Sequence, residues 1–192
     1  MGDPEVLSVE TVYSGFISLE RLRVRLRDGA EVWRDLERHG PSVAILPYDP
    51  ERRVALVANL FRVAVFRTTG DAVSQEACAG MIGDEAPDFA VRREALEELG
   101  VRLPQLLKVG CVWASPGISD ERVHLFLAPY SRSDRVGPGG GADGEHENIE
   151  VQECELGGLA LAADAGEICD SKLLILVQTL RLRLPQVFLA PA

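Results

Sequence analysis

The sequence predicts an α+β fold, an α/β/α sandwich in which helices cover both faces of a mixed β-sheet. Its 192 residues are the usual length of one domain, and a hydrophobic content of 46% is enough to bury a core. Strand-like segments fill the first half of the chain, one helix with clear end signals follows, and helices close the sequence. This order of elements is the basis of the predicted fold class.

The N-terminal segment is predicted to form antiparallel strands. Residues 6–14 and 16–26 carry β-branched and alternating apolar side chains, which favour strands. Asp28-Gly29 is a hairpin-turn signal, and residues 31–36 supply the partner strand.

Three apolar segments after this hairpin also have the composition of strands. Residues 41–49 and 52–61 are joined by a turn around Asp49-Pro50. Residues 72–82 form the next predicted strand, which leads into Gly83.

A helix is predicted over residues 87–99, because Pro87 suits its first turn and Gly100 its C-terminal stop. At 3.6 residues per turn, one face carries three carboxylates and the opposite face is expected to pack on the sheet. The carboxylates are those of Glu94, Glu97 and Glu98, and the packing residues are Phe89, Leu96 and Leu99.

The C-terminal part of the chain is predicted to contain two strands, a glycine-rich loop and two helices. Asp170 is a plausible N-cap for the last helix, which Pro185 ends. The strands span residues 108–115 and 122–130, the loop 136–148, and the helices 159–165 and 171–184.

Composition excludes several classes of protein. A net charge of −10 argues against non-specific nucleic-acid binding, which requires a basic surface. No apolar run is long enough to cross a bilayer, and the acidic N-terminus lacks the pattern of a signal peptide. Four widely spaced cysteines without a CxxC pair are typical of reduced thiols in a cytoplasmic protein.

The grouped carboxylates allow two interpretations. Glu94, Glu97 and Glu98 form a solvated charged face if Arg92 and Arg93 are their partners. Alternatively, their mutual repulsion is relieved by a hard dication such as Mg²⁺, which takes oxygen ligands and bridges to substrate phosphates. The second interpretation predicts metal-assisted hydrolysis of a phosphoanhydride.

The segment from residue 80 to 101 resembles the box of the Nudix hydrolases, G-x5-E-x7-R-E-U-x-E-E-x-G-U, in which U is a bulky aliphatic residue. REALEELGV, residues 93–101, matches its second half, with Ala95 as a small substitute for U. Glu85 lies at the correct spacing before Arg93, but only four residues separate it from Gly80. We expect the loop before Pro87 to absorb this missing residue without changing the register of the helix.

Further segments resemble the branch of this family that contains the ADP-ribose pyrophosphatases and the GDP-mannose hydrolases. They are AGMI before the box, and SPGISDERVHLFLA, GGGADGEHENIEV and GEICDSKLLILVQTLRL after it. The resemblance implies a Nudix domain over residues 43–192 and an N-terminal antiparallel β extension over residues 1–42. It also implies a homodimer in which the extension packs across the partner.

The resemblance assigns roles to individual residues. Mg²⁺, for which Mn²⁺ can substitute, would be bound by Glu94, Glu98, Glu147 and the carbonyl oxygen of Ala79. The catalytic residues would be Glu145, as general base, together with Glu147 and Glu97, and the substrate contacts would be Arg62, Arg34 and Glu121.

The expected activity is hydrolysis of the pyrophosphate bond of a nucleoside diphosphate sugar. The first expected substrate is ADP-ribose, which would yield AMP and ribose 5-phosphate, and the second is GDP-mannose. The alternative is a catalytically silent Nudix-fold module that only binds a nucleotide sugar. No nucleic-acid or membrane partner is expected.

Overall fold

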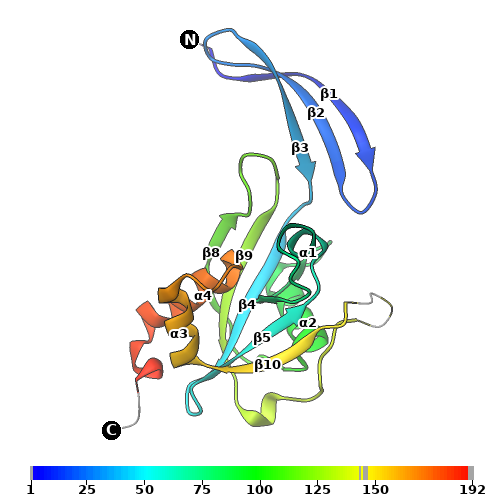
Figure 1. The fold of residues 1–192 in the computed structure, drawn as a ribbon. Helices are drawn as coiled ribbons and strands as arrows, with labels where there is room; N and C mark the ends of the chain where they lie inside the picture. Colours follow the sequence, from blue (N-terminus) through cyan, green and yellow to red (C-terminus); the bar gives the residue numbers. More distant parts are fainter. Residues whose placement is uncertain (1, 143, 145–146, 190–192) are drawn as a thin grey trace. The chain divides into compact units, whose positions relative to one another are not determined.

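The computed structural model describes residues 2–142, 144 and 147–189 (Figure 1). Its internal contacts divide the chain into two compact units. The first runs through Pro41 and includes Cys111–Val123, and the second comprises Ser42–Gly110 and the chain from His124 onward.

An antiparallel three-stranded sheet forms most of the first unit. Its order is β1-β2-β3, and its strands are Glu5–Ser14, Ser18–Arg25 and Glu31–Arg38. The predicted hairpin turn is confirmed: Gly29 has a φ of 87°, and the Asp28 carboxylate accepts the N–H of Ala30 at 3.0 Å. A bridge between Glu37 and Ser119 joins β3 to the connection that follows Trp113.

A seven-stranded sheet forms the centre of the second unit. Its main path is β10-β5-β4-β9-β8, with β6 paired to β5 and β7 paired to β4. β4 is antiparallel to β5 and runs in the same direction as β9, so the sheet is mixed as predicted (Figure 1). The strands are β4 (Ser42–Asp49), β5 (Val54–Leu60), β6 (Ser74–Glu76), β7 (Cys78–Met81), β8 (Leu107–Trp113), β9 (Arg122–Pro129) and β10 (Glu150–Glu155).

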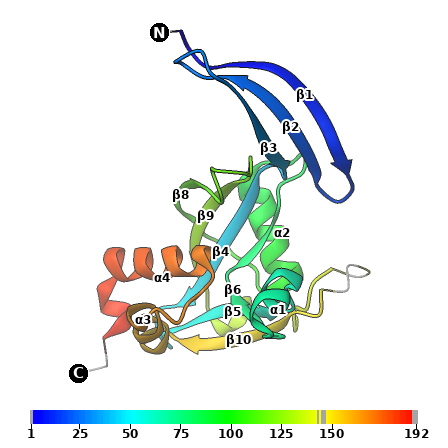
Figure 2. The same cartoon turned by 45° about the horizontal axis from the view of Figure 1, so that its top comes forward.

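Helices cover both faces of this sheet, which confirms the predicted sandwich. α2 packs on one face, and α3 and α4 pack on the other (Figures 1 and 2). β4 is buried along its whole length, as expected of a strand covered on both sides. The helices are α1 (Val63–Thr69), α2 (Pro87–Leu99), α3 (Leu156–Ala165) and α4 (Ser171–Arg183), with short 3₁₀ turns at Arg132–Asp134 and Pro185–Phe188. None of the helices in the described ranges is both long and apolar enough to cross a membrane.

The predicted packing face of α2 is wrong for two of its three residues. Phe89 and Leu96 are exposed, and only Leu99 is buried. The face that packs on the sheet consists mainly of small residues, Ala90, Val91 and Ala95. Small side chains let the helix approach the strands closely, which brings its carboxylates near the backbone of β7.

Two elements were not expected from the sequence. α1 follows β5 directly and ends at Gly70, which has a φ of 86°. Its residues include two valines and a phenylalanine, whose local preference is for strands, so tertiary context decides its conformation. β10 follows the glycine-rich loop and pairs antiparallel with β5.

Candidate active site

Two carboxylates of α2 converge on the backbone of β7. The N–H of Ala79 donates a hydrogen bond to Glu98 Oε2 at 3.3 Å. A side chain on the next residue, Gly80, would overlap the carboxylate of Glu94. Glycine is therefore required at this position because the strand and the helix approach each other with a carboxylate between them.

The shortened box loop leaves the helix in the expected register. Gly83 takes a φ of 59° in the turn, and α2 begins at Pro87 and ends at Leu99 as predicted. Glu85 still reaches the helix, since its Oε1 lies 2.8 Å from Nε of Arg93. The missing residue is thus absorbed between β7 and α2.

Arg93 connects the carboxylates of the box. Its Nη1 lies 2.9 Å from Glu94 Oε1 and 3.0 Å from Glu97 Oε2. Its Nη2 donates to the carbonyl oxygen of Met81 at 3.3 Å. These charge-assisted contacts fix the orientation of the glutamates relative to the end of β7.

Among the carboxyls of the site, Glu98 has the pKa that is raised most clearly. It is only 4% exposed, and burial raises the pKa of its carboxyl to about 8, with the negative charges of Glu94 and Glu147 adding to the effect. Burial also raises the pKa of Glu94, although Arg93 opposes that shift. The Cys78 thiol donates a hydrogen bond to Glu98 and opposes the rise there. A bound dication would relieve the repulsion among these carboxylates.

Glu147 reaches the same region from the loop before β10. A Cβ on Gly141 would lie 2.8 Å from Glu147 Oε2, so the loop glycine and the glutamate are in close contact. The charge of Glu147 raises the pKa of both Glu94 and Glu98, which places the three carboxylates in one electrostatic environment.

The donors in this region suit a hard cation such as Mg²⁺, because they are carboxylate and carbonyl oxygens. Within the described ranges, however, no three His, Cys, Asp or Glu side chains are gathered tightly enough to hold a metal ion by themselves. Glu94 and Glu98, with the charge of Glu147 acting on both, are chemically suited to such an ion, but in the described ranges they do not form a preassembled three-ligand site.

The triple glycine of the loop is attached to the C-terminal end of α2. The N–H groups of Gly140 and Gly141 donate to the carbonyl oxygens of Glu98 and Glu97 at 2.9 and 3.1 Å. Gly139 has a φ of 76°, and a side chain there would overlap the Glu98 carbonyl. These glycines therefore cap the helix that carries the carboxylates.

Arg62 stands at the N-terminus of α1 and forms a two-point ion pair with Glu76. The distances are 3.0 Å from Nε to Oε1 and 3.1 Å from Nη2 to Oε2. The charges of Glu98 and Glu147 also contribute to the raised pKa of Arg62, after the hydrogen bond to Glu76, so its guanidinium lies within electrostatic range of these carboxylates. Sequence reasoning missed Glu76, whose only signal is a lone carboxylate at the end of the short polar strand β6.

Of the remaining predicted site residues, two lie in the first unit and one lies outside the described residues. Arg34 lies on β3 and donates to the carbonyl oxygen of Trp33, and Glu121 lies 3.9 Å from Nδ1 of His39. Both belong to the first unit, whereas the carboxylates of α2 belong to the second. Glu145 lies outside the described residues.

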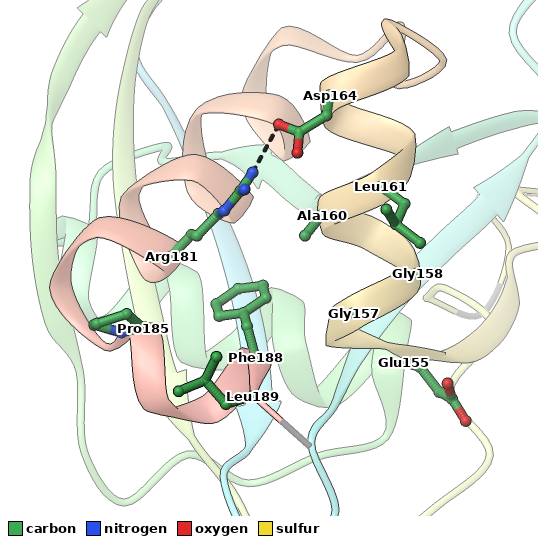
Figure 3. A pocket seen from close by; sticks show the side chains of 10 residues that line it. All are labelled: Glu155, Gly157, Gly158, Ala160, Leu161, Asp164, Arg181, Pro185, Phe188 and Leu189. Atoms are coloured by element: carbon green, nitrogen blue, oxygen red, sulfur yellow. Dashed lines mark hydrogen bonds and ion pairs between the residues drawn. The ribbon is translucent and has the colours of Figure 1, made fainter.

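A separate pocket of about 630 Å³ lies between α3 and the end of α4 (Figure 3). An ion pair of 2.7 Å between Arg181 and Asp164 crosses one side of it. No predicted site residue lines this pocket, so it is distinct from the carboxylate cluster. Its lining is formed by Glu155, Gly157, Gly158, Ala160, Leu161, Asp164, Arg181, Pro185, Phe188 and Leu189.

Comparison with known proteins supports the interpretation of this geometry. The NUDIX domain family matches residues 38–170 of the chain. The GDP-mannose pyrophosphatase of Cronobacter sakazakii is 36% identical over 151 residues, which cover 78% of each chain. That of Citrobacter koseri is 35% identical over 149 residues, covering 77% of this chain and 76% of the relative.

A solved structure shares the fold at much lower identity. The structure described as an ADP compounds hydrolase superposes with a TM-score of 0.78 and covers 96% of both chains at 16% identity.

Proposed function

The chain belongs to the Nudix family, and on that premise we propose that it hydrolyses the pyrophosphate bond of a nucleoside diphosphate sugar. The observation that carries the proposal is the approach of Glu94 and Glu98 to the backbone of β7, with the charge of Glu147 acting on both carboxyls and Arg62 within electrostatic range. The products would be a nucleoside monophosphate and a sugar phosphate.

The carboxylates would hold a divalent cation, Mg²⁺ in our proposal, with Mn²⁺ able to replace it. Its ligands would be Glu94 and Glu98, the main-chain carbonyl of Ala79, and Glu147 from the loop. When bound, the ion supplies positive charge for the diphosphate and for the attacking water. The protein's own contribution is to orient these oxygens, which Arg93 and the backbone of β7 support.

The remaining roles follow the sequence predictions. We propose that Arg62 binds a phosphate oxygen, that Glu145 accepts a proton from water, and that Glu97 supports the neighbouring carboxylates through Arg93. Arg34 and Glu121 are proposed to contact the substrate. Hydrolysis adds water to one phosphorus and breaks its bond to the bridging oxygen, so that each product keeps one phosphate.

GDP-mannose is the first substrate to test, because the curated relatives above are GDP-mannose pyrophosphatases. ADP-ribose, the substrate expected first from the sequence, becomes the second. The shortened box loop is the feature of the sequence that would favour the alternative, a silent binding module. Since that loop leaves Glu85 in contact with Arg93 and the helix in register, no observation now favours it.

We also propose a cytoplasmic homodimer that associates through the N-terminal sheet. The register of β1, β2 and β3 places Val9 opposite Leu22, and Val24 between Val6 and Val32, on one face. Val6 and Val9 are more than half exposed on this face. Such an apolar surface is typical of a contact with another chain.

The proposed activity can be tested with a hydrolysis screen of the purified protein in Mg²⁺. The substrates are GDP-mannose, ADP-ribose, diadenosine polyphosphates and NADH, and products are separated by ion-exchange chromatography. We expect turnover of at least one nucleotide sugar at a rate well above that of the other two classes. No turnover of either nucleotide sugar would refute the proposal.

A further inference from the structure

The proposed phosphate-binding residue, Arg62, is one of four charged side chains that form a network. Glu76 is buried on β6 and uses both of its carboxylate oxygens within this network. Arg62 binds both oxygens, and Nζ of Lys172 lies 3.5 Å from Oε2. Lys172 in turn lies 2.7 Å from Oδ1 of Asp170.

Asp170 connects this network to two backbone segments. Its side chain caps α4 by accepting the N–H of Leu173 at 3.1 Å. The same oxygen, Oδ2, accepts the N–H of Ala77 at 3.0 Å. The beginning of α4 is therefore attached to the residue that follows Glu76 and lies two residues before Ala79.

Arg62, Glu76 and Lys172 keep their charges in this network. Burial favours the neutral form of Glu76, but Arg62 and Lys172 outweigh it and hold the pKa of its carboxyl below the ordinary value. Burial likewise opposes the charge on Lys172, yet Asp170 and Glu76 raise its pKa. Two positive and two negative groups therefore balance each other, with Glu76 buried and Arg62 exposed at the edge of the network.

The pair with Glu76 determines which nitrogen of the Arg62 guanidinium is available to bind a further partner. The pair with Glu76 uses Nε and Nη2 and leaves Nη1 for another partner. Among the described residues, Nη1 makes no hydrogen bond. Without Lys172, the full negative charge of Glu76 would be balanced by Arg62 alone, and the guanidinium would be drawn toward the carboxylate and away from an incoming phosphate.

We propose that Lys172 is a positioning residue for phosphate binding. Anchored by Asp170, it shares the charge of Glu76, so that Arg62 keeps one edge on Glu76 and presents Nη1 to the diphosphate of the substrate. This inference rests on the proposed function, because it assumes that Arg62 binds the substrate.

The test compares Lys172→Met with Arg181→Met, which removes the same charge from the same helix but breaks only an exposed pair with Asp164. For Lys172→Met we expect KM for the nucleotide sugar to rise on the order of tenfold, with kcat changed less than about twofold. Arg181→Met should leave both constants unchanged, and Lys172→Arg, which keeps the charge, should recover most of the affinity.

A double-mutant cycle with Arg62→Met separates positioning from general destabilisation. If Lys172 acts through Arg62, replacing it should have little further effect on KM once Arg62 is absent. An additive effect, or a Lys172→Met variant that behaves like Arg181→Met, would overturn the inference. If Lys172→Met is too unstable to assay, Asp170→Asn provides the same cycle, because asparagine still caps a helix but does not anchor the ammonium.

The proposed function and this inference fail in different ways. A wild-type protein that hydrolyses no nucleotide sugar would refute the function. The same cycle would then be measured as the affinity for α,β-methylene ADP by calorimetry, and an additive result there would refute the role of Lys172.

Discussion

Glu98 is a buried carboxyl whose pKa lies far above the ordinary value because of burial and the negative charges of its neighbours. Its pKa of about 8 means that, without a metal, the folded protein keeps a proton that the unfolded chain releases near the ordinary pKa of 4.5. The carboxyl therefore favours the folded state fully below about pH 4.5, and this contribution is lost as the pH rises through about 8.

We predict that the metal-free protein loses stability between about pH 5 and pH 8 through this one group. The measurement is the midpoint of thermal unfolding in EDTA at several pH values, for the wild type and for Glu98→Gln. The glutamine variant should show a smaller loss over this range, and Mg²⁺ should stabilise only the wild type at pH 8. Parallel pH profiles for the two proteins would contradict the assignment.

At the residue scale, some candidate site residues can be chosen from the sequence and others cannot. Glu94 and Glu98 could be selected because their spacing on a helix and the surrounding motif agree. Glu76 and Lys172 could not, because their significance comes from a contact between residues 96 positions apart in the chain. A lone carboxylate in a strand and a lone lysine in an apolar helix carry no comparable signal.

At the scale of the elements, hydrogen bonds connect the end of α2 to the glycine-rich loop. Gly139, Gly140 and Gly141 all have positive φ angles, and two of them donate to the last carbonyls of the helix. The loop that carries Glu147 is thereby attached to the helix that carries Glu94 and Glu98.

We predict that Gly139→Ala lowers stability more than Gly144→Ala. Both residues have positive φ, so each substitution costs about 1–2 kcal/mol of backbone strain. Only at Gly139 would the new methyl group overlap the Glu98 carbonyl, whereas nothing lies within 4 Å at Gly144. Urea unfolding measures both free energies, and equal losses would mean that the attachment to α2 is unimportant.

The ends of α2 could be predicted from the sequence, but its packing face could not. Pro87 and Gly100 are local signals that act on the helix itself, and they fix its length correctly. Which side packs depends on how closely the helix approaches the sheet, and here alanine and valine pack while Phe89 remains exposed. α1 was missed for a related reason, since its valines and phenylalanine favour strands locally.

At the scale of the whole molecule, the first unit presents an apolar face that the chain's own sequence pattern produces. Alternation along β2 separates Leu22 and Val24 from Arg21, Arg23 and Arg25. The arginine face is satisfied within the sheet by ion pairs, such as that of 2.9 Å between Arg21 and Asp35. Among the described residues, the face that carries Val6, Val9 and Val24 has no comparable set of ion pairs. This supports its proposed role between two chains.

We predict that Val9→Glu converts the protein from a dimer to a monomer. A carboxylate in the centre of an apolar interface would be desolvated without a partner. Light scattering coupled to gel filtration should give twice the chain mass of 20.9 kDa for the wild type and one chain mass for the variant. The control is Ser8→Glu, which pairs with Arg23 on the opposite face and should remain dimeric. A monomeric wild type would refute the proposed dimer.

The carboxylate cluster as a metal-binding catalytic site is tested most directly by Glu98→Gln. The variant keeps the shape of the side chain but loses the charge, and its matched control is Asp88→Asn, an exposed carboxylate in the first turn of the same helix. With GDP-mannose and Mg²⁺, we predict that kcat falls by at least about a hundredfold in Glu98→Gln and is unchanged in Asp88→Asn. Wild-type turnover by Glu98→Gln would contradict the assignment of the site.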